Sequence, residues 1–156
     1  MKKLIAYFSA TGITAAAAKE LARLIGADLF EIRPPKAYTA ADLDWRDAHS
    51  RSTLEMTDPA ARPAVAGEIP DLGQYDIICV GFPIWWYVAP RIINTFLERC
   101  DLIGKTVIPF ATSGGSGVEK ISESIRESCP GAFLLEPKLL NDSEALSAFA
   151  EALKAD

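Results

Sequence analysis

Short apolar segments alternate with helix-like segments along this 156-residue chain, and the alternation constrains the fold more than any other feature. The apolar segments are typical of strands and cover residues 3–8, 29–32, 75–82, 106–111 and 132–135. Right-handed helical crossovers between parallel strands place helices on both faces of a sheet. The alternation therefore predicts an α/β fold, a doubly wound five-stranded parallel sheet with helices on both faces.

Local signals indicate where the helices begin and end. Gly26 follows the first helical segment as a C-terminal stop. The pattern Ser116-x-x-Glu119 matches a capping box that opens a later helix. Asn141 or Asp142 is expected to cap the C-terminal helix.

The interval between the second and third expected strands, residues 33–74, is unusually long. Residues 39–56 are compatible with a helix that Thr39 caps, and the favoured interpretation is that this is the crossover helix. The alternative is that residues 38–49 also lie over a ligand, because loops of this length are often functional.

Charge and residue counts exclude several classes of function. The chain has 16 Lys and Arg against 21 Asp and Glu, a net charge of -5, and no run of basic residues. Nucleic acid and membrane surfaces are therefore poor partners. Three cysteines without a Cys-x-x-Cys pair, together with one histidine, indicate neither a disulfide framework nor a zinc site, so no metal is expected.

The length of the chain fits a single domain, residues 1–156, and no linker or repeat divides it. The longest uncharged stretch, residues 77–90, contains Gly81 and Pro83 and is shorter than the roughly 20 residues of a membrane-spanning helix. The apolar run near the N-terminus is shorter than the core of a signal peptide. A cytoplasmic protein is expected.

Three loops without charged residues follow the first, third and fourth expected strands. In open parallel sheets, ligands bind beyond the carboxyl ends of the strands, where such loops gather. The first loop, residues 9–14, has three hydroxyl groups around Gly12 immediately before a helix. Hydroxyls and free N–H groups at a helix start suit a phosphate, and the alternative is an ordinary helix cap.

Aromatic side chains dominate the loop after the third strand. Trp85, Trp86 and Tyr87 are consecutive, and three neighbouring rings cannot all point into one core. At least one ring is expected to be exposed or to stack on a flat ligand, and the alternative is an interface or core anchor. The loop after the fourth strand, residues 112–117, is rich in glycine and hydroxyl groups. It suits backbone contacts to a planar heterocycle, or is a flexible turn.

Together the three loops resemble those of the flavodoxin family, and the resemblance covers nearly the whole chain. It implies a flavodoxin-like sheet of strand order 2-1-3-4-5 and noncovalent binding of FMN. The first loop is similar to the one that holds the FMN phosphate, the second would pack on the isoalloxazine ring, and the third would contact its pyrimidine edge. The implied cofactor-binding residues are Ser9, Ala10, Thr11, Gly12, Ile13, Thr14, Pro83, Ile84, Trp85, Trp86, Tyr87, Thr112, Ser113, Gly114, Gly115, Ser116 and Gly117.

The resemblance further implies a redox function through FMN. The leading hypothesis is an electron-transfer protein without a dedicated small-molecule substrate, and no catalytic residue is expected. Its partner would be a redox protein or a small-molecule electron donor or acceptor. The alternative is an FMN-dependent NAD(P)H oxidoreductase of the quinone- or nitro-reductase type. A third hypothesis is a flavin-free interaction module anchored by the tryptophan pair.

Two features separate this chain from short-chain flavodoxins. It has no tyrosine or acidic residue between Ala111 and Val118, and no glycine between Phe82 and Pro90. An NAD(P)H reductase also usually needs cations for its dinucleotide. The nearest candidates, which are Arg46, Arg51 and Arg91, are expected to be ordinary surface residues on helices.

Overall fold

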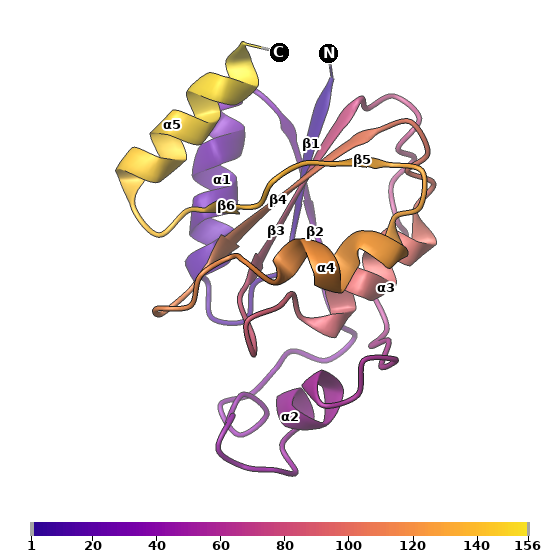
Figure 1. Ribbon diagram of the computed structural model, residues 1–156, viewed down its shortest axis with the longest axis vertical. Coiled ribbons are helices and arrows are strands. Elements are labelled where there is room, and N and C mark those ends of the chain that lie inside the picture. Colours follow the sequence, from indigo (N-terminus) through magenta and orange to yellow (C-terminus); the bar gives the residue numbers. More distant parts are fainter. Residues whose placement is uncertain (1, 156) are drawn as a thin grey trace.

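The computed structural model describes residues 2–155, and within them six strands form one parallel sheet (Figure 1). The strand order is β2-β1-β3-β4-β5, and β6 also pairs with β4. The predicted α/β class and strand order are therefore confirmed. The strands are β1 (Lys3–Tyr7), β2 (Asp28–Glu31), β3 (Ile77–Pro83), β4 (Thr106–Thr112), β5 (Phe133–Leu134) and β6 (Lys138–Leu139).

The outer edge of the sheet is divided into two short strands, of which only β5 was predicted. β5 pairs with the start of β4, and β6 pairs with its end, at Phe110 and Ala111. Pro137 lies between the two strands and has no backbone N–H to donate to a neighbouring strand. The proline explains why pairing at this edge stops and then resumes.

Helices cover both faces of the sheet. They are α1 (Ile13–Ile25), α2 (Arg51–Met56), α3 (Arg91–Arg99), α4 (Ile121–Ile125) and α5 (Ser143–Lys154), with a 3-10 turn, η1 (Arg126–Ser128), after α4. Gly26 ends α1 with φ of 66°, a left-handed conformation that glycine adopts without strain. The side chain of Asp142, rather than that of Asn141, caps α5 by accepting a hydrogen bond from Ala145 N–H.

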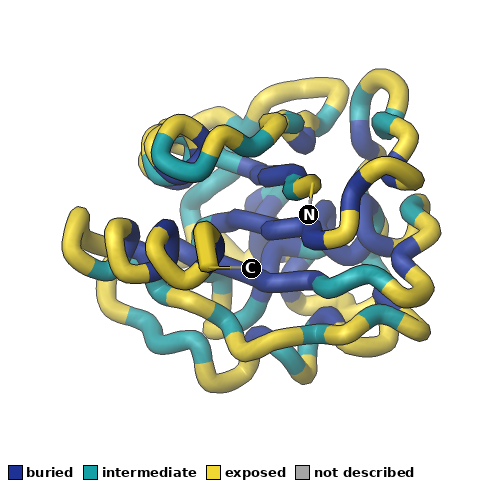
Figure 2. The backbone as a smooth tube through the Cα atoms, turned by 90° about the horizontal axis from the view of Figure 1, so that it is seen from above, coloured by how far each residue is buried: buried dark blue, intermediate teal, exposed yellow. Residues whose placement is uncertain are grey.

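Two apolar cores lie on opposite faces of the sheet, because successive strand residues point to alternate sides. Leu4 and Ile78 face the core beneath α3 and α4, whereas Ile5 and Cys79 face the core beneath α1 and α5. Figure 2 shows the sheet as a buried band between exposed outer segments. Burial on both faces explains why the central strands read as continuous apolar runs.

The predicted start of the helix after β4 is wrong. α4 has five residues and begins at Ile121, after Lys120, so Ser116-x-x-Glu119 is not a capping box. The residues before α4 form a turn, in which the Ser113 hydroxyl donates a hydrogen bond to the Ser116 carbonyl (2.7 Å). This turn delays the start of the helix.

Residues 39–56 do not form the expected crossover helix, because only α2 is helical. Thr39 and Asp42 exchange hydrogen bonds that close a local turn, and Asp44 and Asp47 each accept a bond from a backbone N–H two residues later. Aspartate side chains of this kind compete with helical backbone bonding. The helix starts only after Ser50 caps it, and α2 lies beyond the carboxyl ends of the strands rather than on the sheet (Figure 1).

Cys79 is buried in the centre of the sheet. Burial raises the pKa of Cys79 to about 12, as expected for a cysteine that packs as a small apolar residue. Residues 2–155 contain no group of three or more His, Cys, Asp or Glu side chains that could hold a metal ion. None of the helices within that range is long and apolar enough to cross a bilayer.

The close approach of β3 and β4 gives the first prediction. A side chain at Gly81 would overlap the ring of Phe110, which is completely buried. We expect Gly81→Ala to lower the free energy of unfolding by about 1–3 kcal/mol, as other overpacked cores do. Urea unfolding measures the change. Gly114→Ala is the control, because its new methyl group meets open space; equal losses in both variants would contradict the prediction.

Candidate functional site

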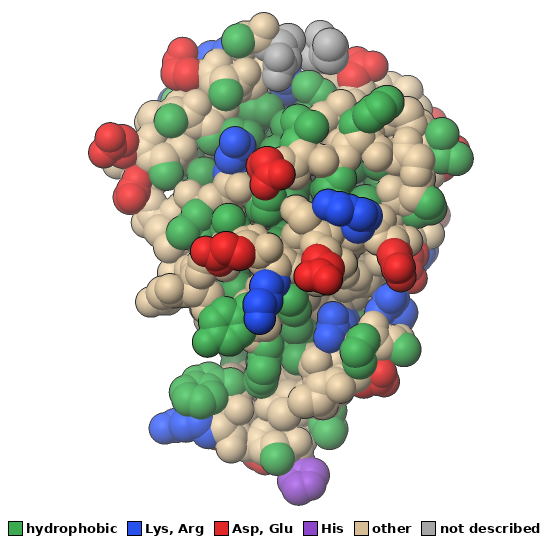
Figure 3. All heavy atoms as spheres, in the orientation of Figure 1, with side chains coloured by type: hydrophobic (Ala, Val, Ile, Leu, Met, Phe, Trp, Pro, Cys, Tyr) green, Lys and Arg blue, Asp and Glu red, His purple; other side chains and the backbone are tan. Residues whose placement is uncertain are grey.

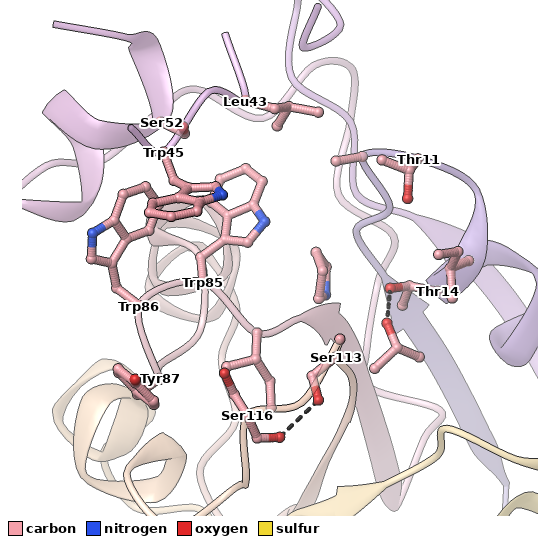
Figure 4. Close-up of a pocket in the computed structure, with 16 residues that line it drawn as sticks. Thr11, Thr14, Leu43, Trp45, Ser52, Trp85, Trp86, Tyr87, Ser113 and Ser116 are labelled. Carbon is pink, nitrogen blue, oxygen red and sulfur yellow. Dashed lines mark hydrogen bonds between the residues drawn. The ribbon is translucent and has the colours of Figure 1, made fainter. Parts of the chain in front are cut away.

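The carboxyl ends of β1, β3 and β4 open into one cavity (Figure 4). Its volume of about 640 Å³ lies within the range of small-molecule sites. In Figure 3, apolar side chains lie on both sides of the notch between the body of the protein and the segment around α2. The lining residues are uncharged and are Ala10, Thr11, Ile13, Thr14, Leu43, Trp45, Ser52, Pro83, Ile84, Trp85, Trp86, Tyr87, Thr112, Ser113, Gly114 and Ser116.

Most of the residues predicted for the site line this cavity, and four do not. Ser9 and Gly12 shape the first loop without lining the cavity. Gly115 lines a neighbouring cavity of about 410 Å³, and Gly117 lines neither of the two. The structure thus gathers the three predicted loops, although not every member faces the same space.

The first loop is closed by the hydroxyl of Ser9. Its Oγ accepts hydrogen bonds from Gly12 N–H and Ala15 N–H, each at 3.1 Å. Gly12 has φ of 95°, which only glycine adopts readily, and α1 begins at the next residue. Ser9 therefore holds the loop in a tight turn at the start of the helix.

Backbone donors at this helix start are free to bind an anion. Among the described residues, the N–H groups of Thr11, Ile13 and Thr14 have no hydrogen-bond partner. The positive end of the helix dipole adds to these donors, and the first turn of α1 has no acidic residue. The buried hydroxyl of Thr14 bonds that of Thr112 (Oγ1 to Oγ1, 2.8 Å) and joins this loop to the end of β4.

The aromatic loop is a tight two-residue turn. Trp85 and Val88 exchange backbone hydrogen bonds of 3.0 Å, while Trp86 and Tyr87 between them have φ of 50° and 70°. Positive φ at both central residues is what a type I′ turn requires, and it strains side chains other than glycine, asparagine and aspartate. This loop therefore reaches a left-handed conformation without the glycine that usually supplies it.

The three aromatic rings of this loop have different surroundings. Trp85 packs edge-on against Phe8 and Tyr38, with ring centroids 5.6 and 5.3 Å away. Trp86 and Tyr87 remain 38% and 60% exposed. The expectation that at least one ring is exposed is confirmed, and Trp85 fixes the loop to the core.

A residue that the sequence analysis did not assign to the site supports the third loop. The Asn141 side-chain carbonyl, Oδ1, accepts a hydrogen bond from Ser113 N–H at 2.8 Å. Asn141 follows β6, so the edge strand that was not predicted also positions this contact. An asparagine beside a helix start is read as a cap, which is why the sequence alone did not reveal this role.

Leu43, Trp45 and Ser52 also line the cavity and come from the long interval between β2 and β3. Leu43 and Trp45 lie within residues 38–49, the range considered as an alternative cover for a ligand. Trp45 is 70% exposed, and Figure 4 shows it near Trp85 and Trp86. The sequence signal that could have indicated this role was Trp45, an isolated tryptophan in the unusually long interval of residues 33–74.

A cluster of charged and aromatic side chains holds this segment in place. The Arg51 guanidinium lies 3.7 Å from the Tyr38 ring centroid and pairs with Asp42 and Glu55 (3.7 and 3.6 Å). The Tyr38 hydroxyl donates a hydrogen bond to Glu55 Oε1 at 2.5 Å. Burial raises the pKa of Glu55 despite its bonds to Tyr38 and Arg51, and burial also raises the pKa of Tyr38. The segment is thus tied to the ring that packs on Trp85.

Arg51 and Arg91 lie on helices, α2 and α3, as expected, whereas Arg46 does not. Arg46 lies in a turn and pairs with Asp44 (Nε to Oδ1, 3.5 Å), and Arg51 belongs to the cluster above. Arg91 donates a hydrogen bond to the Met56 carbonyl (3.0 Å), and partial burial lowers its pKa. Each guanidinium thus has at least one contact within the chain, although Arg91 Nε is buried without a hydrogen-bond partner among the described residues.

The strained turn gives the second prediction. Replacing Trp86-Tyr87 by Asn-Gly, the pair that type I′ turns favour, removes left-handed strain of about 1–2 kcal/mol per residue. We expect W86N/Y87G to raise the free energy of unfolding of the ligand-free protein by about 1 kcal/mol. Urea unfolding measures the free energy of unfolding of this double variant. Trp86→Ala is the control, because alanine at this position keeps the backbone strain. A double variant less stable than Trp86→Ala would refute this account.

Comparison with known proteins agrees with the observed fold. The flavodoxin family profile matches residues 2–154. A Bacteroides uniformis protein of known structure is 49% identical and has a TM-score of 0.91, over 96% of this chain and 97% of that chain. A Lactobacillus acidophilus flavoprotein solved in complex with FMN is 24% identical, with a TM-score of 0.76 over 92% of this chain and 95% of that chain, and shares the fold.

The chain is also similar to a curated relative that is named as a redox enzyme. An FMN-dependent NADH:quinone oxidoreductase from Xanthomonas oryzae pv. oryzae is 29% identical over 140 residues, which are 88% of this chain and 71% of that protein. The profile match covers almost the whole chain, from the first strand to the last helix. The chain therefore belongs to the flavodoxin family.

Proposed function

We propose that the chain binds FMN noncovalently in the cavity and carries electrons through it. The observation that carries the proposal is the arrangement of the cavity, with free N–H groups at the start of α1 on one side and tryptophan rings on the other (Figure 4). A ligand with a phosphate at one end and a planar ring at the other fits this arrangement. Membership of the flavodoxin family supports FMN as that ligand.

The phosphate would be held by the first loop. The N–H groups of Thr11, Ile13 and Thr14 supply donors, the Thr11 hydroxyl supplies another, and the α1 dipole favours an anion. Binding by neutral donors suits this site, because none of its lining residues is charged. Ser9 and Gly12 act by shaping the loop rather than by facing the cavity.

The ring system would lie between the aromatic loop and the third loop. Trp85 is anchored by Phe8 and Tyr38, so it offers a fixed surface for stacking. Ser113 is oriented by Asn141, and this fixes the glycine-rich backbone that would meet the polar edge of the ring. Bound FMN supplies the redox chemistry, while these residues orient it and exclude water.

An electron carrier is the function that the charge distribution favours. None of Arg46, Arg51 and Arg91 lines the cavity, and each already contacts another group of the chain, so they are poorly placed to bind the diphosphate of a dinucleotide. A net charge of -5 also repels such an anion. A redox partner needs only a small transient interface beside the cavity, where Trp86 and Tyr87 are exposed.

A reductase is the second candidate, because the curated relative is named an FMN-dependent NADH:quinone oxidoreductase. One further cation lies near the cavity, since Lys120 Nζ is 5.7 Å from the ring centroid of Tyr87. NAD(P)H would then be the electron donor and a quinone or nitro compound the acceptor.

The third prediction tests the phosphate end of the cavity. We expect the apoprotein to bind one FMN per chain and to prefer it to riboflavin, because riboflavin lacks the phosphate that the first loop would hold. Thr11→Val should weaken FMN about tenfold, as expected for a hydrogen bond to a charged group, with little effect on riboflavin. Calorimetric titration measures both affinities.

The control for this titration is Thr95→Val, because Thr95 lies on α3 and does not line the cavity. Its affinities for FMN and riboflavin should match those of the wild-type protein. Equal affinity of the wild-type protein for FMN and riboflavin would exclude the proposed phosphate site. Absence of binding to either flavin would exclude the proposed cofactor.

The fourth prediction separates carrier from reductase. Under anaerobic conditions, NADH or NADPH alone should reduce the bound FMN slowly, because the lining of the cavity carries no cation for the dinucleotide. A flavodoxin reductase or a photochemical donor should reduce it readily. Absorbance of the flavin band follows both reactions. Bleaching by NADPH alone within seconds, with turnover on a quinone, would favour the reductase instead.

A further inference from the structure

Residues 39–56 form a wall of the cavity that the three strand-end loops do not supply. Leu43, Trp45 and Ser52 line the cavity from this segment, and Figure 4 shows them on one side of it. The phosphate and ring contacts proposed for FMN all come from the strand-end loops. The additional wall, which we call the 39–56 wall, is therefore available to contact a second molecule.

Trp45 is a large aromatic residue held at the cavity in an exposed position. Its side chain is 70% exposed, and no other aromatic ring of the described chain packs against it. Only the Arg46 guanidinium lies over it, at 5.9 Å from the ring centroid. An indole with so little packing contributes little to the core, whereas its flat face suits a planar ligand.

Ser52 supplies a buried polar atom without a partner. The residue is 1% exposed, and its Oγ forms no hydrogen bond within the described chain. A buried hydroxyl without a hydrogen bond is costly, so nearly all such groups in proteins have a partner. Because Ser52 also lines the cavity, a ligand with an oxygen acceptor can satisfy this hydroxyl.

The 39–56 wall is fixed by ion pairs that hold both of its arginines. Arg51, which precedes Ser52, is held by Tyr38, Asp42 and Glu55. Arg46, which follows Trp45, is paired with Asp44. Both arginines are paired with carboxylates, and the four acidic residues of the segment outnumber its two arginines, which gives it a formal charge of -2. The aromatic face and the hydroxyl therefore lie in surroundings that disfavour an anionic ligand. Such a surface suits a flat, neutral molecule with a carbonyl oxygen.

We propose that the 39–56 wall is a second subsite, which binds a planar, uncharged aromatic carbonyl compound of the quinone class. The ligand stacks on Trp45 and accepts a hydrogen bond from Ser52 Oγ. This inference rests on the proposed function, because the subsite adjoins the space assigned to FMN. In this proposal, Trp45 and Ser52 select the second molecule and do not bind the cofactor.

The test measures binding without turnover. Oxidised, FMN-loaded protein is titrated by calorimetry with 2,3-dimethyl-1,4-naphthoquinone, whose ring positions are blocked against reaction with thiols. We expect Trp45→Ala and Ser52→Ala each to weaken the quinone by about five- to tenfold, and to change FMN affinity by less than twofold. Leu54→Ala is the control, because Leu54 is exposed on α2 and does not line the cavity.

A stability measurement distinguishes binding from a structural role. Because Ser52 Oγ has no partner within the described chain, Ser52→Ala should leave the thermal midpoint of the ligand-free protein unchanged or higher. A lower midpoint would assign the hydroxyl to folding and overturn its role in the subsite. Unchanged quinone affinity in Trp45→Ala would overturn the subsite as a whole.

FMN affinity, measured on every variant, separates this inference from the proposed function. If Trp45→Ala weakens FMN as much as the quinone, Trp45 contacts the cofactor and the subsite is overturned. If the wild-type protein binds no FMN, the proposed function fails, and the same quinone is titrated into the apoprotein. Binding that depends on Trp45 and Ser52 then supports the subsite, and no such binding overturns it.

Discussion

Parallel pairing of β1, β3 and β4 is the constraint on which the cavity depends. Tyr7 pairs with Gly81, and Gly81 with Phe110, so the three strands stay in register up to their carboxyl ends. Gly81 lets the Phe110 ring lie directly against the sheet, where a larger residue would collide with it. Three loops that are distant in sequence therefore start side by side, and the Thr14–Thr112 hydrogen bond joins two of them.

Polar contacts and aromatic packing, rather than core burial, hold the loops in shape beyond the strand ends. Ser9 closes the first loop, Asn141 orients the third, and the packing of Trp85 against Phe8 holds the second in its left-handed turn. Backbone strain of this kind concentrates at functional sites, where surrounding contacts over-determine it. The position of the strained turn at the cavity is consistent with selection for binding rather than for stability.

In the long interval between β2 and β3, the local sequence pattern did not predict the observed structure. Its apolar spacing suggested a crossover helix, yet Asp42, Asp44 and Asp47 bond nearby N–H groups and break the helix into turns. The segment instead lies beyond the strand ends, where Arg51 contacts Tyr38 and Glu55. These contacts join residues on either side of the turns, and no periodic pattern encodes them.

The sequence by itself determined the α/β class, the approximate positions of the strands and the three uncharged loops, because apolar periodicity and turn residues report local structure and burial. Tertiary structure alone decided that Ser9 shapes its loop, that Asn141 supports Ser113, and that Trp45 and Ser52 reach the cavity. The physical reason is the sequence separation of the residues that interact. A strand or helix follows from neighbouring residues, whereas a cavity wall is made by side chains that only the packing of distant segments brings together.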